Sequence, residues 1–81
     1  MTLCLLFFSE IRDALGREEE RLDLPSGSRV KDLERLLRRR APQIAGLLGS
    51  VTFAVNNEYV DRDGELQDGD VVALILPISG G

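Results

Sequence analysis

The segment Thr2–Phe8 reads TLCLLFF, and every position after Thr2 is apolar. A run of this length has the size of a strand. Its residues are apolar at both odd and even positions, which point to opposite faces, so both faces of the strand are expected to be covered. A second apolar run, Val71–Leu76 (VVALIL), follows near the other end of the chain. The two segments are therefore predicted to lie side by side in the middle of one sheet.

The segments between these runs predict the rest of the sheet and one main helix. In Glu18–Leu24 apolar and charged residues alternate toward the end of the segment, and further charges flank it. This pattern is typical of an edge strand. After Ser28, apolar residues recur at helical spacing until Pro42 stops the pattern. Further strands are expected at Val51–Val55 and Tyr59–Val60. This order predicts an α+β fold: a mixed sheet of about five strands with one main helix packed on one face.

Local signals predict how these elements begin and end. Ser9 and Ser28 are expected to be helix N-caps, and Gly16 to end a short connecting helix. The stretch from Ile44 to Leu48 is expected to be a loose apolar connection. Asn56-Asn57 and the segment 67–70 are predicted turns, with Gly69 at positive φ. One helix covers one face only, so the central strands leave apolar surface on the other face for a partner.

Composition limits the protein to one small domain. The chain has 81 residues, 43% hydrophobic, and a net charge of −4, with residues 41–81 carrying Arg62 as their sole basic side chain. The acidic balance disfavours nucleic acid, and no apolar run has the length of a membrane span. The single cysteine indicates a cytoplasmic protein. Residues 1–76 are expected to form the domain and residues 77–81 a flexible tail.

The residue inventory excludes most catalytic chemistry in this chain. There is no histidine, which removes His-activated nucleophiles and His-bearing metal sites. The segment from Asp61 resembles a calcium loop but lacks its glycine and final glutamate. Cys4 is interpreted as a small hydrophobe, and Asp68 and Asp70 as turn residues. Without a phosphate-binding loop, any ATP used in the function must bind to another polypeptide.

The closing residues suit the delivery of a carboxylate into a narrow site on another protein. Gly80 and Gly81 have no β-carbon and allow close approach of the backbone, and Pro77 reduces the entropy lost on docking. Ile78 can anchor this segment and Ser79 separates it from the glycines. At neutral pH an α-carboxylate is an anion and a poor electrophile, because its pKa is about 3.3–3.7. The carboxylate of Gly81 must therefore be activated, for example as an acyl-adenylate, before sulfur or an amine can attack it.

Several segments resemble the small subunits of molybdopterin synthase, the MoaD branch of the ubiquitin-like sulfur carriers. They are the opening 6–9 (LFFS) with Arg12, the segment 53–56 (FAVN), the turn 68–70 (DGD) and the ending 76–81 (LPISGG). The ending is the most specific, although relatives carry a second proline where this chain has Leu76. The resemblance implies a β-grasp, ubiquitin-like fold.

The resemblance also implies partners and roles. Gly81 would be adenylated by an E1-like enzyme that uses ATP, converted to a thiocarboxylate, and would donate its sulfur to a pterin precursor. The chain itself would bind no cofactor or metal and would be a non-catalytic subunit, in a heterotetramer of two small and two large synthase subunits. Residues 77–80 would insert into the large subunit, and Phe8, Arg12, Tyr59 and Ile75 would contact it.

Three other functions use related chemistry or the same fold. A thiamine-type sulfur carrier and a ubiquitin-like modifier that forms isopeptide bonds would both activate the same carboxylate. A binding module with an inert tail would not. Deletion of Gly81 separates the last of these from the others.

Overall fold

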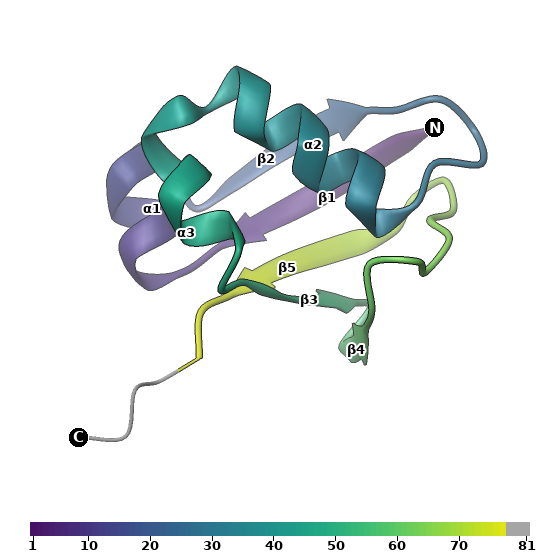
Figure 1. The fold of residues 1–81 in the computed structure, drawn as a ribbon. Coiled ribbons are helices and arrows are strands. Elements are labelled where there is room, and N and C mark those ends of the chain that lie inside the picture. Colours follow the sequence, from purple (N-terminus) through teal and green to yellow (C-terminus); the bar gives the residue numbers. More distant parts are fainter. Residues whose placement is uncertain (78–81) are drawn as a thin grey trace.

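The computed structural model describes residues 1–77, which form a five-stranded mixed sheet with helices on one face (Figure 1). The sheet order is β2-β1-β5-β3-β4, with β1 parallel to β5 and the other neighbours antiparallel. The strands are β1 (Thr2–Phe7), β2 (Glu19–Asp23), β3 (Thr52–Val55), β4 (Glu58–Val60) and β5 (Val71–Ile75). The helical segments are α1 (Ser9–Leu15), α2 (Val30–Arg40), the 3₁₀ turn η1 (Pro42–Ile44) and α3 (Ala45–Leu48). The predicted α+β class and the central β1–β5 pair are confirmed.

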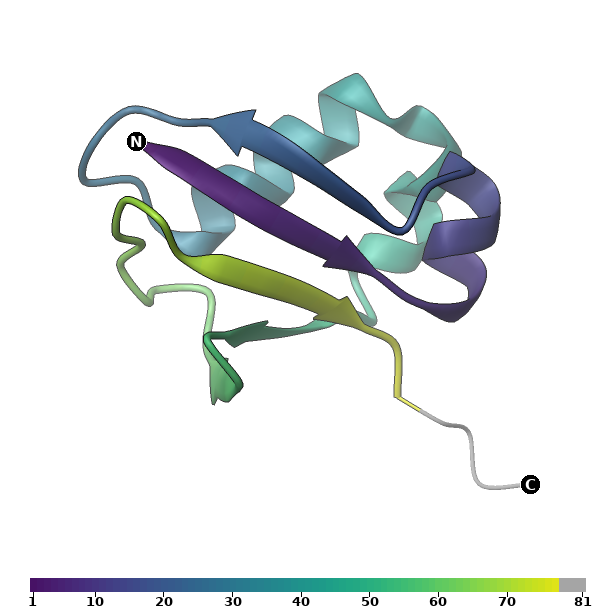
Figure 2. The same ribbon diagram turned by 180° about the vertical axis from the view of Figure 1, so that it is seen from behind.

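The core lies between the sheet and α2. Leu3, Leu5 and Phe7 alternate along β1 on the helix side and are buried, as are Val72 and Leu74 of the neighbouring β5. Buried side chains from the helical layer meet them: Ile11, Val30, Leu33, Leu37, Ile44 and Leu48. Seen from behind, the sheet has no helix over its second face (Figure 2). The even-numbered positions of β1 are therefore exposed (Thr2) or partly exposed (Cys4 and Leu6), as a single main helix predicts.

The two predicted turns are confirmed. Asn56 and Asn57 have φ of 50° and 71° and form the two-residue connection between β3 and β4, for which amide side chains at positive φ are favoured. Gly69 has φ of 85° before β5. The Asp70 carboxylate is buried and accepts hydrogen bonds from Asn56 Nδ2 (2.9 Å) and from the Gln67 backbone N–H (2.8 Å). Asp70 is thus a turn residue, as predicted.

The predicted helix caps are wrong. Ser9 is the first residue of α1, whose N-cap is Phe8, and the serine makes no side-chain capping bond. The N-cap of α2 is Arg29, and the Ser28 hydroxyl instead donates to the Pro25 carbonyl (2.7 Å).

The start of α2 is stabilised by a different residue. The carboxylate of Asp32 accepts the Arg29 backbone N–H (2.8 Å), the reach-back that an acidic side chain makes at the third helical position. The end of α1 follows the prediction, because Gly16 caps it in the left-handed conformation.

The stretch expected to be a loose connection after Pro42 is helical. Ile44 and Leu48 are four residues apart and fully buried, which is the spacing of one helical face. The segment forms η1 and α3 and closes one end of the core.

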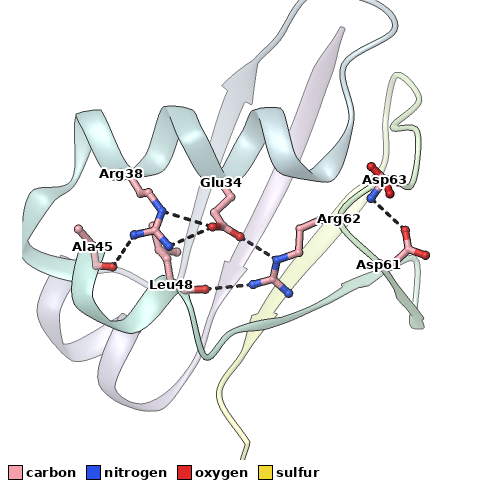
Figure 3. Close-up of polar contacts among 7 residues, drawn as sticks. All are labelled: Glu34, Arg38, Ala45, Leu48, Asp61, Arg62 and Asp63. Carbon is pink, nitrogen blue, oxygen red and sulfur yellow. Dashed lines mark hydrogen bonds and ion pairs between the residues drawn. The ribbon is translucent and has the colours of Figure 1, made fainter.

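A carboxylate shared by two arginines connects three elements on the helix side (Figure 3). Glu34 of α2 pairs with Arg62 Nε (2.9 Å) and with Arg38 Nη2 (3.0 Å). The two guanidinium groups also donate to α3 carbonyls, Arg62 Nη2 to Leu48 (3.1 Å) and Arg38 Nη1 to Ala45 (3.1 Å). This network fixes α3 and the β4–β5 connection against α2.

Candidate functional site: an open apolar sheet face beside the C-terminal segment

Leu76 and Pro77 follow β5 and are the last residues that the structure describes. Leu76 is partly buried against the core, and Pro77 is exposed. Because β1 and β5 are parallel, with Phe7 opposite Leu74, both strands end at the same side of the sheet (Figure 2). Phe8 continues β1 in extended conformation (φ −131°, ψ 160°) and so lies beside the end of β5. The predicted insertion residues Ile78, Ser79 and Gly80 and the reactive Gly81 lie outside the described residues.

The face without helices carries a continuous row of side chains across all five strands. The register places Glu19 of β2 opposite Leu6, Leu6 opposite Ala73, Ala73 opposite Ala54, and Ala54 opposite Tyr59 of β4. Residues opposite one another in a sheet share a face. We call the surface formed by Cys4, Leu6, Phe8, Ala54, Tyr59, Val71, Ala73 and Ile75 the open sheet face.

The open sheet face is apolar at its centre and carries its large side chains toward its rim. Ala54, which is buried, and Ala73, which is partly exposed, contribute single methyl groups to the middle of the row, while Phe8 is 46% exposed and Tyr59 73% exposed. Exposed aromatic side chains around an apolar surface are typical of a protein-binding site, because their burial on docking removes a large area from water. The surface is thus suited to a partner protein.

Three of the four predicted contact residues, Phe8, Tyr59 and Ile75, belong to this face. Arg12 lies in α1, which follows Phe8 directly, and its Nε is 3.5 Å from the neighbouring Asp13 carboxylate. Leu6, Phe8, Arg12 and Glu19 line an open depression of about 420 Å³. A guanidinium and two carboxylates, those of Glu18 and Glu19, therefore flank the apolar surface near the end of β5.

Sequence reasoning missed five members of the face: Cys4, Leu6, Ala54, Val71 and Ala73. The sequence does contain a signal for these residues, because each alternates with the core residues of its strand and so points to the opposite face of the sheet. The sequence does not give the register between strands, and only the register shows that Ala54 and Ala73 lie opposite each other.

Residues 1–77 contain no group of three His, Cys, Asp or Glu side chains that could hold a metal ion. Cys4 is a free thiol, partly buried on the open sheet face opposite Arg21. Within the same part of the chain, no helix is long and apolar enough to cross a membrane.

Comparisons with known proteins agree with this geometry. The model of the ThiS family matches residues 5–81. A molybdopterin synthase sulfur carrier subunit from Chlamydomonas reinhardtii is 36% identical over 83 aligned residues, which cover both chains fully. Molybdopterin converting factor subunit 1 from Pyrococcus furiosus has a TM-score of 0.86 and 32% identity, over 96% of this chain and 99% of that one.

A further solved structure contains two proteins. It is the complex of subunits 1 and 2 of molybdopterin-converting factor from Helicobacter pylori, in which a chain matches with a TM-score of 0.74 and 27% identity over the full length of both. These similarities confirm the predicted β-grasp fold and the family resemblance seen in the sequence. The chain belongs to the ThiS family.

Proposed function

We propose that this protein is the sulfur carrier subunit of a molybdopterin synthase, with the carboxylate of Gly81 as the group that carries sulfur. Membership of the ThiS family carries the proposal, together with full-length similarity to relatives that bear this name. The open sheet face beside the end of β5 supports it, because a carrier must dock while its C-terminal segment enters another protein.

The proposed chemistry consists of an activation and a transfer. A carboxylate oxygen of Gly81 attacks the α-phosphate of ATP on an E1-like enzyme, which releases pyrophosphate and forms an acyl-adenylate. A sulfur nucleophile then displaces AMP and leaves a thiocarboxylate. In the synthase the thiocarboxylate sulfur attacks a carbon of the pterin precursor and displaces an oxygen substituent from it. Water then cleaves the acyl–sulfur bond, which leaves the sulfur on the pterin and returns Gly81 to a carboxylate. The chain is consumed and recharged, and ATP binds to the activating partner alone.

The proposed partner of the open sheet face is the large synthase subunit. The solved Helicobacter pylori complex pairs a similar chain with subunit 2 of its converting factor, which supports a partner of this kind. Phe8, Tyr59 and Ile75 would be buried against it, and Pro77 would direct the following residues into its active site. The activating enzyme, the heterotetramer and the cytoplasmic location stay predictions.

Deletion of Gly81 tests the requirement for the terminal carbonyl. In cells that lack their own small subunit, the deletion variant should fail to restore molybdopterin production, because the atom that is activated has been removed. A Ser26→Ala variant, altered in an exposed loop far along the chain from the terminus, should restore it. Circular dichroism should show the same fold for both. Restoration by the deletion variant would exclude both the sulfur carrier and the isopeptide-forming modifier.

A further inference from the structure

Ser9, between β1 and the body of α1, has an unusual backbone conformation. Its φ is 49°, in the left-handed region that residues other than glycine, asparagine and aspartate rarely occupy. Among residues 1–77, the other positive φ angles belong to glycines and to Asn56 and Asn57 of a turn, where they are favoured. Ser9 is therefore the position in this range at which residue type and backbone conformation disagree.

The side chain of Ser9 does not account for this conformation. It is exposed and makes no capping hydrogen bond at the start of α1. A left-handed residue without such compensation raises the free energy of the folded chain, and it persists only where the surrounding structure holds it. Strained positions of this kind are concentrated at sites that bind or react.

The residues around Ser9 show what holds it. Phe7 and Ile11 are both buried in the core, whereas Phe8 between them is 46% exposed. The Phe8 carbonyl accepts the Ile11 N–H (3.1 Å), so α1 begins without a linker after β1. The chain must therefore pass from the open sheet face back to the core between Phe8 and Ile11, and the left-handed Ser9 provides the change of direction (Figure 2).

The place of the Phe8 side chain depends on this turn. The backbone of Phe8 is extended (φ −131°, ψ 160°), which continues the alternation of β1 and directs the side chain to the open sheet face. With an ordinary φ at Ser9, α1 would leave β1 in another direction, and either Ile11 or Phe8 would have to move. Removal of a buried side chain from the core costs more than rotation of an exposed one, so Phe8 is expected to move.

We propose that Ser9 is a positioning residue for docking, whose left-handed backbone holds the Phe8 side chain on the open sheet face before the large synthase subunit binds. This inference rests on the proposed function. An aromatic side chain that is fixed in advance loses less entropy when a partner buries it. Leu6 and Arg12 line the same depression as Phe8, so the turn also sets the guanidinium beside the aromatic ring.

Substitutions at Ser9 test the proposal by calorimetry of binding to the large subunit. Valine disfavours positive φ because its β-carbon is branched, so Ser9→Val should lower the affinity at least about fivefold, as loss of an important interface contact does. Ser9→Asn tolerates the left-handed region and should bind as the unaltered chain does. Ala14→Val places the same branched side chain at an exposed position of α1 that has no positive φ, and it should have little effect.

A double-mutant cycle shows whether the effect passes through Phe8. In a chain that already carries Phe8→Ala, Ser9→Val should reduce the affinity no further, because the side chain that Ser9 positions is gone. Additive losses would assign the effect of Ser9 to something other than Phe8 and would overturn the proposal.

Measurements on the free chain separate this inference from the proposed function. Nuclear Overhauser effects should connect the Phe8 ring with the Leu6 and Arg12 side chains in the unaltered chain and in Ser9→Asn, since these residues line one depression. In Ser9→Val they should weaken, while those of the Phe7 ring within the core remain. Unchanged effects from the Phe8 ring in Ser9→Val would overturn the positioning role. An unaltered chain that does not bind the large subunit would instead contradict the proposed function.

Thermal melts complete the test. Ser9→Val should stay folded at the temperature of the binding measurement, and Ser9→Asn should melt no lower than the unaltered chain, because asparagine relieves the strain. A loss of affinity in Ser9→Val that is matched by the fraction unfolded would make Ser9 a structural residue only and would also overturn the proposal.

Discussion

Arg62 is one of several residues that join the helical layer to the β4–β5 connection. It pairs with Glu34, donates to the Leu48 carbonyl, and its guanidinium carbon lies 5.1 Å from the centre of the Phe53 ring. Arg62→Ala removes all three contacts, so we expect a loss of about 1–3 kcal/mol in the free energy of unfolding.

Chemical denaturation measures this loss, and Arg39→Ala is the matched control. Arg39 is exposed and forms no ion pair within residues 1–77, so its replacement should change stability by less than about 0.5 kcal/mol. Arg62→Lys should recover only part of the loss, because an ammonium group does not reproduce the planar fork. An Arg62→Ala variant as stable as the control would show that the network contributes nothing.

Gly69 tests the effect of backbone conformation alone. Its φ is 85°, and a β-carbon placed there would meet nothing within 4 Å. Gly69→Ala should therefore destabilise by about 1–2 kcal/mol through the left-handed backbone, without a steric clash. Gly46→Ala is the control: Gly46 also has open space, lies in α3 and has no positive φ, so alanine should stabilise by up to about 1 kcal/mol. Thermal melts of both variants give the comparison, and equal effects would contradict it.

At the scale of the element, the two faces of β1 and of its continuation at Phe8 have different expected roles. One face packs into the core, and the other is the proposed docking surface. Phe7 is 2% exposed and Phe8 46% exposed, although they are neighbours. Phe7→Ala should cost about 3–5 kcal/mol in stability, since it opens a cavity in the core. Phe8→Asp should leave the fold intact and lower the affinity for the large synthase subunit at least about tenfold, as loss of an aromatic anchor does.

Calorimetry of binding and a denaturation curve on each variant check this division. The proposed docking surface would be wrong if Phe8→Asp bound the large subunit normally. If Phe8→Asp unfolded the chain, Phe8 would instead be a core residue.

Alternation along the strands was sufficient to predict most elements but not their ends. The apolar runs at 2–8 and 71–76 predicted the central pair of strands, β1 and β5. In a small sheet, apolar side chains on both faces of a strand are best tolerated in the middle. The N-caps at Ser9 and Ser28 were wrong because serine also suits turns, where Ser28 bonds to Pro25. The helical segment ending at Leu48 was missed because two buried residues four apart are too short a pattern to indicate a helix.

At the scale of the whole molecule, the sequence predicted that one sheet face is uncovered but not how far the apolar surface on it extends. Apolar residues at both odd and even positions of the central strands predicted an uncovered apolar face. The resemblance to known carriers then indicated Phe8, Tyr59 and Ile75 within it. The register then added Leu6, Ala54 and Ala73, which come from three strands far apart in the chain. Long-range pairing of this kind has no local signal in the sequence.

The central claim is that this chain carries sulfur on the terminal carbonyl of Gly81. Intact mass spectrometry tests it most directly, on the chain incubated with its activating enzyme, ATP and a sulfide donor. The account predicts a mass increase equal to the exchange of one oxygen for one sulfur, located in the C-terminal peptide and absent when ATP is left out. An unchanged mass in the presence of an active activating enzyme, or sulfur found on Cys4 instead, would contradict it.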